Sequence, residues 1–152
     1  MEKIYRVSGT LDRGFVGQIT YTVCLEKTYR KLDIAFSFGK RKYAEEDVTS
    51  ELMEETRILC QEKYGMTATD EEIRRIILND MKTEIHTLAT LNDQFIGCVH
   101  KQLLTRHMTW DGENASEGCV PQEAFDGVLK VTVLVFNVLM DGTPYSLTVQ
   151  AE

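Results

Sequence analysis

The sequence predicts an α+β fold, in which an antiparallel sheet, flat or strongly curved, packs against two or three helices. Residues 3–38 alternate apolar and polar side chains with the period of two that is typical of half-buried strands. Residues 128–150 hold two further strand-like apolar segments around an Asp-Gly turn. Between these regions the apolar period changes to about 3.6 residues, which predicts helices inserted between the strands of one domain, residues 1–152.

The N-terminal region is predicted to be a three-stranded antiparallel meander. Apolar side chains occupy the odd positions of residues 15–25 and the even positions of residues 32–38. A two-residue turn at Lys27-Thr28 would pair Val23 with Leu32, and then Tyr21 with Ile34, so that both apolar sets share one face. A register slip by one residue would turn either set toward water, which makes this arrangement specific.

The first hairpin of the meander creates a candidate ligand-binding gap. A three-residue loop, Asp12 to Gly14, would place Gly9 opposite Gly17 and Tyr5 opposite Tyr21. Two facing glycines leave room for a close approach, although filling of the gap by Phe38 or a helix is the simpler expectation. The candidate lining residues are Tyr5, Gly9, Gly17, Tyr21, Phe38 and Tyr145.

The C-terminal region is predicted to be a hairpin with a type I′ turn at Asp141-Gly142. This turn would pair Phe136 with Leu147 and Val138 with Tyr145. The run from 128 to 140 is almost continuously apolar, which indicates a central strand covered on both faces, and residues 145–150 suit an edge strand. We expect this hairpin and the meander to join in one sheet or half-barrel.

Two helices are predicted between the strand regions. Thr49 is a suitable N-cap for the first, and Gly65 is a suitable C-terminal stop. The second begins at Thr69, which forms a capping box with Glu72. Its apolar stripe continues through Ile73, Ile77, Met81, Ile85 and Leu88, which predicts a helix to about Leu91.

After Leu91 the sequence leaves two alternatives. Continuing the helical stripe to Leu103 would give one helix of about 50 Å, too long for a small domain, so a break at Asn92-Asp93 or a kink at Gly97 is expected. Alternatively, residues 95–110 form strand structure, with Asn92 and Asp93 as a hairpin turn. Residues 111–125 are polar and contain glycine and proline, and are predicted to be a loop.

Composition limits the classes of partner. The chain has 152 residues and a formal net charge of −7, which argues against nucleic acid binding. No run approaches the roughly 20 apolar residues of a membrane span, and the first residues do not resemble a signal peptide, so we expect a cytoplasmic protein. The four cysteines, Cys24, Cys60, Cys98 and Cys119, lack the spacing of a zinc site and are expected to be reduced thiols. No metal or cofactor is expected.

Cys98, His100 and His86 are the weak candidates for catalysis. If residues 95–110 form a strand, Cys98 and His100 point to the same side. A two-residue turn would pair His86 with Val99, whereas a three-residue loop could pair it with Cys98 or His100. Cys98 could then be a nucleophile with a histidine as base, although a buried cysteine beside a histidine is commoner without catalysis.

Two functional hypotheses follow. The first is a non-catalytic domain that binds a small apolar ligand or a protein partner in a groove between sheet and helices. The second is a small thiol- and imidazole-dependent hydrolase or transferase that uses Cys98 and His100. We favour the first because it depends only on features that the strand pattern supports.

Overall fold

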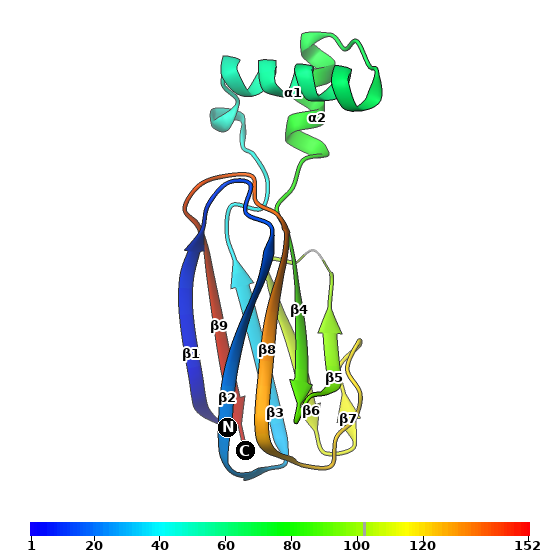
Figure 1. The fold of residues 1–152 in the computed structure, drawn as a ribbon. Coiled ribbons are helices and arrows are strands. Elements are labelled where there is room, and N and C mark those ends of the chain that lie inside the picture. The colour runs from blue at the N-terminus through cyan, green and yellow to red at the C-terminus, as the bar shows by residue number, and fades with distance from the viewer. Residues whose placement is uncertain (102) are drawn as a thin grey trace.

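The computed structural model, which describes residues 1–101 and 103–152, is a sandwich of two antiparallel sheets with a pair of helices at one end (Figure 1). Mostly antiparallel sheet with few helices is therefore confirmed, but the expectation of one sheet is wrong. The first sheet has the order β1-β9-β3-β6-β7 and the second β2-β8-β4-β5. The strands of the first sheet are β1 (Glu2–Leu11), β9 (Thr143–Ala151), β3 (Lys31–Phe38), β6 (Thr105–Asp111) and β7 (Asn114–Ala115). Those of the second are β2 (Gly17–Tyr29), β8 (Phe125–Asn137), β4 (Glu84–Leu91) and β5 (Gln94–Val99).

The predicted meander is wrong, because β1, β2 and β3 do not pair with one another. Strand β1 pairs with β9, β2 pairs with β8, and β3 lies between β9 and β6. The predicted pairs of Val23 with Leu32 and Tyr21 with Ile34 are therefore absent. Yet the inward faces were read correctly, since these four side chains belong to the interior between the two sheets. Alternation identifies which face of a strand is buried, and it says nothing of which strand lies beside it.

The predicted C-terminal hairpin is also wrong. The residues after β8 cross from one sheet to the other, so Phe136 and Leu147 are not paired. Strand β8 is central, between β2 and β4, as expected. Its outer face is not fully covered, because Phe136 is 50% exposed. Strand β9 lies between β1 and β3 and is not an edge strand.

The predicted helix up to Leu91 is wrong beyond Asn79. Helix α2 (Asp70–Asn79) ends there, and residues 84–91 form β4, with Ile85 and Ala89 buried in the sandwich. The strand alternative for the following residues is correct in β5 and β6. Asn92 and Asp93 form the turn with φ of 51° and 66°, the left-handed values that a type I′ turn requires.

The predicted loop after Asp111 covers a sheet edge. Besides the short strand β7, residues 118–120 lie along the free edge of β5. The Cys98 amide donates to the Gly118 carbonyl at 3.0 Å, and the Val120 amide donates to the Ile96 carbonyl at 2.8 Å. These bonds satisfy backbone groups that an exposed edge strand would leave open to other chains.

Helix α1 (Ser50–Tyr64) begins and ends at the predicted residues, and α2 begins at its predicted residue. The Thr49 hydroxyl accepts the Leu52 amide at 3.1 Å, Gly65 adopts a left-handed φ of 61°, and Thr69 forms its capping box with Glu72. A single-turn 3₁₀ helix, η1 (Glu45–Asp47), precedes α1. In the described part of the chain, no helix is long and apolar enough to cross a membrane.

The two helices have a hydrophobic core of their own at the end of the sandwich (Figure 1). Its buried members are Tyr43, Leu52, Cys60, Ile73, Ile77 and Leu139. Leu139 comes from the β8–β9 connection and Tyr43 from the segment leading to α1, and the Tyr43 hydroxyl donates to the Leu139 carbonyl at 2.9 Å. An ion pair of 2.6 Å joins Arg13, in the β1–β2 connection, to Glu55 of α1. These contacts attach the two helices to the end of the sandwich.

Candidate functional site

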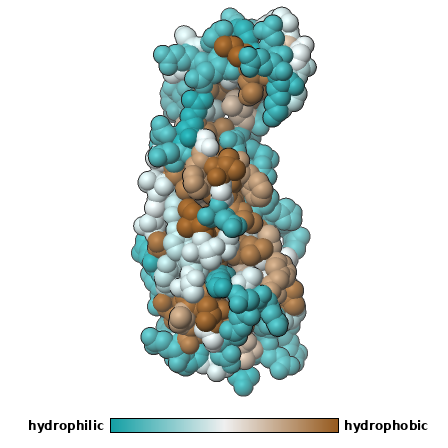
Figure 2. All heavy atoms as spheres, viewed as in Figure 1, coloured by the Kyte–Doolittle hydropathy of each residue, from teal (hydrophilic) through white to brown (hydrophobic). Residues whose placement is uncertain are grey.

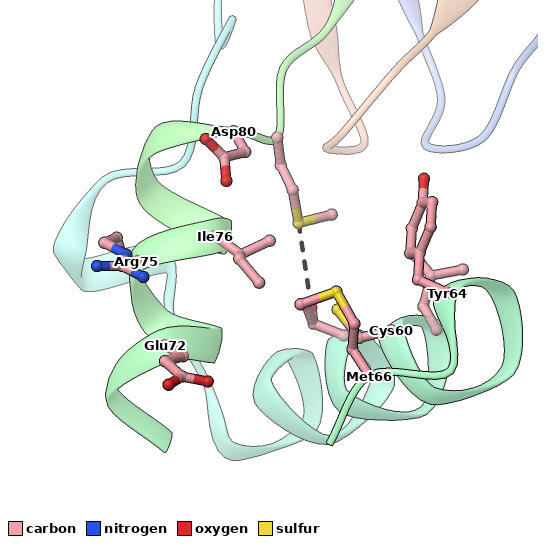
Figure 3. A pocket seen from close by; sticks show the side chains of 10 residues that line it. Cys60, Tyr64, Met66, Glu72, Arg75, Ile76 and Asp80 are labelled. Atoms are coloured by element: carbon pink, nitrogen blue, oxygen red, sulfur yellow. Dashed lines mark hydrogen bonds between the residues drawn. The ribbon is translucent and has the colours of Figure 1, made fainter. Parts of the chain in front are cut away.

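A groove of about 710 Å³ lies between α1 and α2 and the segments that follow them (Figure 3). This volume falls within the roughly 300–1,000 Å³ of typical ligand-binding sites. Its lining residues are Thr56, Leu59, Cys60, Tyr64, Met66, Glu72, Arg75, Ile76, Asp80 and Met81. We call it the helical groove.

The local helix chemistry shapes the helical groove. Thr56 and Cys60 lie one turn apart on the buried stripe of α1, and the Thr56 hydroxyl donates to the Leu52 carbonyl at 2.7 Å and contacts the Met81 sulfur at 4.0 Å. Gly65 then reverses the chain, and the Met66 amide donates back to the Cys60 carbonyl at 3.1 Å. This is the Schellman arrangement, which returns an apolar side chain toward the helix it ends. Met66 thereby joins the wall of the groove.

Several apolar side chains of the helical groove are exposed to solvent. Leu59 and Met66 are each 46% exposed and Tyr64 is 62% exposed. Figure 2 shows apolar atoms in brown among the hydrophilic atoms of the helical end. Contiguous exposed apolar side chains with a polar rim are typical of binding sites, and methionines adapt to different partners.

Three charged side chains from α2 and its end line the same groove. Glu72, Arg75 and Asp80 are exposed, and Figure 3 shows them along the α2 side. The Glu72 carboxylate accepts the Thr69 amide at 3.3 Å in the capping box. The site therefore combines an apolar floor with a charged rim.

The structure brings His86 and His100 together on the outer face of the second sheet. The turn between β4 and β5 has two residues, but a bulge shifts the register after Ala89, so Val99 lies opposite Thr87 and Cys98 opposite Leu88. The predicted pairing of His86 with Val99 is wrong for this reason. The rings of His86 and His100 are 5.9 Å apart between centroids.

Cys98 and His100 line a second hollow of about 360 Å³, together with Ser116 and Gly118 from the covering segment. Within residues 1–101 and 103–152, no group of three or more His, Cys, Asp or Glu side chains is arranged to hold a metal ion. Near this hollow, burial raises the pKa of the Cys119 thiol, whose sulfur lies 3.5 Å from the Ser116 hydroxyl. The nucleophile hypothesis for Cys98 stays a prediction.

Arg106 is a buried cation beside this hollow that sequence reasoning missed. It is 3% exposed, its guanidinium lies 5.3 Å from the ring centre of Phe36, and it donates to the Lys101 carbonyl at 3.0 Å and to the Ile85 carbonyl. Burial lowers the pKa of the guanidinium to about 10. These contacts tie β4, the β5–β6 connection and β6 together. The sequence did contain a signal for its burial, because Arg106 alternates with Met108 and Trp110 on the same face of β6.

The predicted glycine gap is divided between the two sheets. Gly17 lies opposite Val135 in the second sheet, so Gly9 and Gly17 do not face each other. Gly9 lies opposite Tyr145, and a Cβ at Gly9 would be 2.8 Å from the Tyr145 hydroxyl, so this ring occupies the space that the glycine leaves.

The other predicted lining residues do gather around Tyr145. Its hydroxyl lies 2.5 Å from that of Tyr21, whose ring centre is 6.2 Å from that of Tyr5. Phe38 is opposite Tyr145 in the adjacent strand. Burial, with this hydroxyl contact, raises the pKa of Tyr21 well above its ordinary value.

Comparison with known proteins assigns the chain to a family. A family model described as a family of unknown function, DUF6669, matches residues 1–152. The chain belongs to this family. The DUF6669 match spans the sandwich and both helices, so the helical groove lies within the region that the family model describes. No curated protein and no solved structure matches the chain.

For this DUF6669 protein, the sequence reasoning missed the helical groove. The signal that could have found it is a set of apolar residues outside the buried stripe of α1. Leu59, Tyr64 and Met66 lie around the predicted helix stop at Gly65, where a solvent-facing helix end would ordinarily be polar.

Proposed function

We propose that this DUF6669 protein is a non-catalytic binding protein whose helical groove holds an apolar helical segment of a partner protein. The observation that carries this proposal is the open, apolar groove of about 710 Å³ between α1 and α2. Grooves between helices commonly bind an amphipathic helix through apolar residues spaced by three, four and seven positions.

A helical segment suits the groove better than a small molecule. Sites for small ligands commonly bury 70–90% of the ligand surface. Here Tyr64 is 62% exposed, and Leu59 and Met66 are each 46% exposed, so the wall on the α1 side is open to solvent. A longer occupant can cover these side chains together and remove more apolar area from water.

The two adjacent residues Leu59 and Ile58 provide a matched test. Both are 46% exposed on α1, but only Leu59 lines the groove. We expect peptides selected by the full chain from a displayed library of helix-forming sequences to share apolar positions at helical spacing. Leu59→Asn should weaken their binding by about tenfold or more, the effect of losing an apolar contact of about 1.4 kcal/mol, and Ile58→Asn should leave it unchanged. Fluorescence anisotropy of the labelled peptides measures both.

Circular dichroism and urea unfolding of both variants serve as the control for folding. Selected peptides without helical apolar spacing would contradict the proposal. Equal losses from Leu59→Asn and Ile58→Asn would also contradict it, because the binding would then depend on α1 stability rather than on the groove.

A further inference from the structure

We infer that the segment held in the helical groove is cationic: a basic amphipathic helix of a partner protein. This inference rests on the proposed function and adds the chemical class of the partner. It is carried by the distribution of charge between the helical end and the sandwich.

The helical end contains all of the net charge of the protein. Residues 45–80 include 11 aspartates or glutamates and 4 lysines or arginines, a formal net charge of −7. The whole chain also has a formal net charge of −7, because the other 13 acidic and 13 basic residues cancel. The rest of the chain is therefore neutral overall, and the excess negative charge belongs to the segment that forms the groove.

Two of the four basic residues of the helical end form ion pairs within it. Arg57 pairs with Glu54 at 3.3 Å and also with Asp70, and Arg74 pairs with Glu45. Among the described residues no ion pair engages Arg75, which lines the groove between Glu72 and Asp80 along the chain. The excess carboxylates are thus left to face solvent and any partner.

Helix stability explains only part of this acidic character. Carboxylates in a first turn, such as Glu51 and Asp70, favour the positive end of the helix dipole. Glu62 lies in the last turn of α1, and Asp80 is the C-cap of α2, where the dipole favours cations instead. Asp80 also lines the groove. Its negative charge is therefore unfavourable for the α2 dipole but lies where it can contact a bound segment.

Charge complementarity favours a cationic segment as the occupant of the groove. The apolar floor supplies contact area to any amphipathic helix, and the surrounding carboxylates favour one whose polar positions are lysine or arginine. A second copy of this chain would bring its own acidic helices, and like charges in apposition disfavour that pairing.

Three synthetic peptides test the inference. Each is an amphipathic helix about four turns long with the same leucine positions, and the polar positions are all Lys, all Gln or all Glu. We expect the Lys peptide to bind the full chain about tenfold or more tightly than the Gln peptide, and the Glu peptide to bind weakest. The dissociation constant of the Lys peptide should rise with salt concentration, since salt screens exposed charges.

Charge variants at the rim localise the effect. Asp80→Asn should weaken binding of the Lys peptide about two- to fivefold. Arg75→Gln should strengthen this binding by a similar factor, as expected for single charges near a surface. Glu123→Gln makes the same charge change on an exposed residue in the connection before β8, at the end of the sandwich far from the helices (Figure 1), and should have no effect.

The outcomes separate this inference from the proposed function. Equal binding of the Lys and Gln peptides, with both weakened by Leu59→Asn, would overturn the cationic partner and leave the groove as a binding site. Binding of the Lys peptide that Leu59→Asn does not change, or no binding of any peptide, would overturn both. Self-association in sedimentation that Leu59→Asn abolishes would make a second copy the occupant and overturn the cationic partner.

Discussion

The tyrosine hydroxyls between the two sheets are held by one short contact. The oxygens of Tyr21 and Tyr145 are 2.5 Å apart, and the two residues come from different sheets. A buried hydroxyl needs a partner, and each tyrosine supplies it for the other. Ionising Tyr21 would place a negative charge in this poorly hydrated space, which is why the pKa of Tyr21 is raised.

Tyr21→Phe should reduce the sensitivity of the protein to alkali. The ordinary pKa of a tyrosine is 10.0, and the pKa of Tyr21 is raised in the folded protein. Above pH 10.0 Tyr21 therefore keeps its proton in the folded protein, whereas the same hydroxyl is deprotonated in the unfolded chain. The folded state then binds more protons, so the free energy of unfolding falls as pH rises above about 10. We expect the Tyr21→Phe variant to show a shallower fall, measured by urea unfolding at several values of pH between about 9 and 11.

Tyr64→Phe is the control, because it removes a hydroxyl from a tyrosine that is 62% exposed. If Tyr21→Phe and the unchanged protein lose stability with the same slope in this range, the buried hydroxyl contact has no role in the alkaline response.

At the scale of elements, the β4–β5 hairpin depends on its own turn and on a neighbouring strand. The Asn92 side chain accepts the Val128 amide at 2.9 Å and donates to the Asp126 carbonyl at 3.0 Å. These bonds clamp the turn against the start of β8. Gly127 lies between the two bonded residues, with a left-handed φ of 85°.

Gly127→Ala should destabilise the protein by more than the cost of placing an alanine in a left-handed backbone conformation. A Cβ at Gly127 would lie 2.2 Å from the Asn92 side-chain oxygen, so the clamp must break or move. Gly112→Ala is the matched control, since Gly112 has a φ of 63° and open space around the added Cβ. We expect Gly112→Ala to cost about 1 kcal/mol and Gly127→Ala about 2 kcal/mol more, measured by urea unfolding. Equal costs would show that the clamp contributes nothing.

Prediction from sequence succeeded for elements whose signals are local. The caps at Thr49, Gly65 and Thr69 depend on the backbone of the same helix, and the structure has them where the sequence places them. It failed for β4, where buried positions include Thr87 and Ala89, so the alternation in apolar character is weak. There burial between the sheets overrides the helical pattern.

In the described part of the chain, two hydrophobic cores lie next to each other at the β8–β9 connection. The sandwich core and the helical core are separate clusters, and Leu139 belongs to the helical one although it directly follows Val138, which belongs to the other. The β8–β9 connection is therefore one of the places where the helices contact the sandwich.

Leu139→Ala should loosen the helices selectively. Leu139 is 3% exposed, and removing a buried leucine commonly costs about 2–5 kcal/mol. We expect faster amide hydrogen exchange in α1 and α2 with little change in β3 and β9. Leu147→Ala, in the fully buried sandwich core, should instead reduce protection throughout the strands. Uniform acceleration in the Leu139→Ala variant would mean that the two cores unfold as one unit.

The sequence alone determined the inward faces of the first three strands, the ends of α1, the start of α2 and the segregation of acidic charge. Each of these depends on side-chain spacing along one segment, which a chain carries before it folds. Only the tertiary structure decided the strand partners, the bulge in the β4–β5 pair that brings His86 near His100, and the helical groove. In a sandwich two sheets bury their apolar faces against the same interior, so many pairings satisfy one alternation, and long-range packing selects among them. The groove exists because two separately capped helices meet at an angle that no single segment specifies.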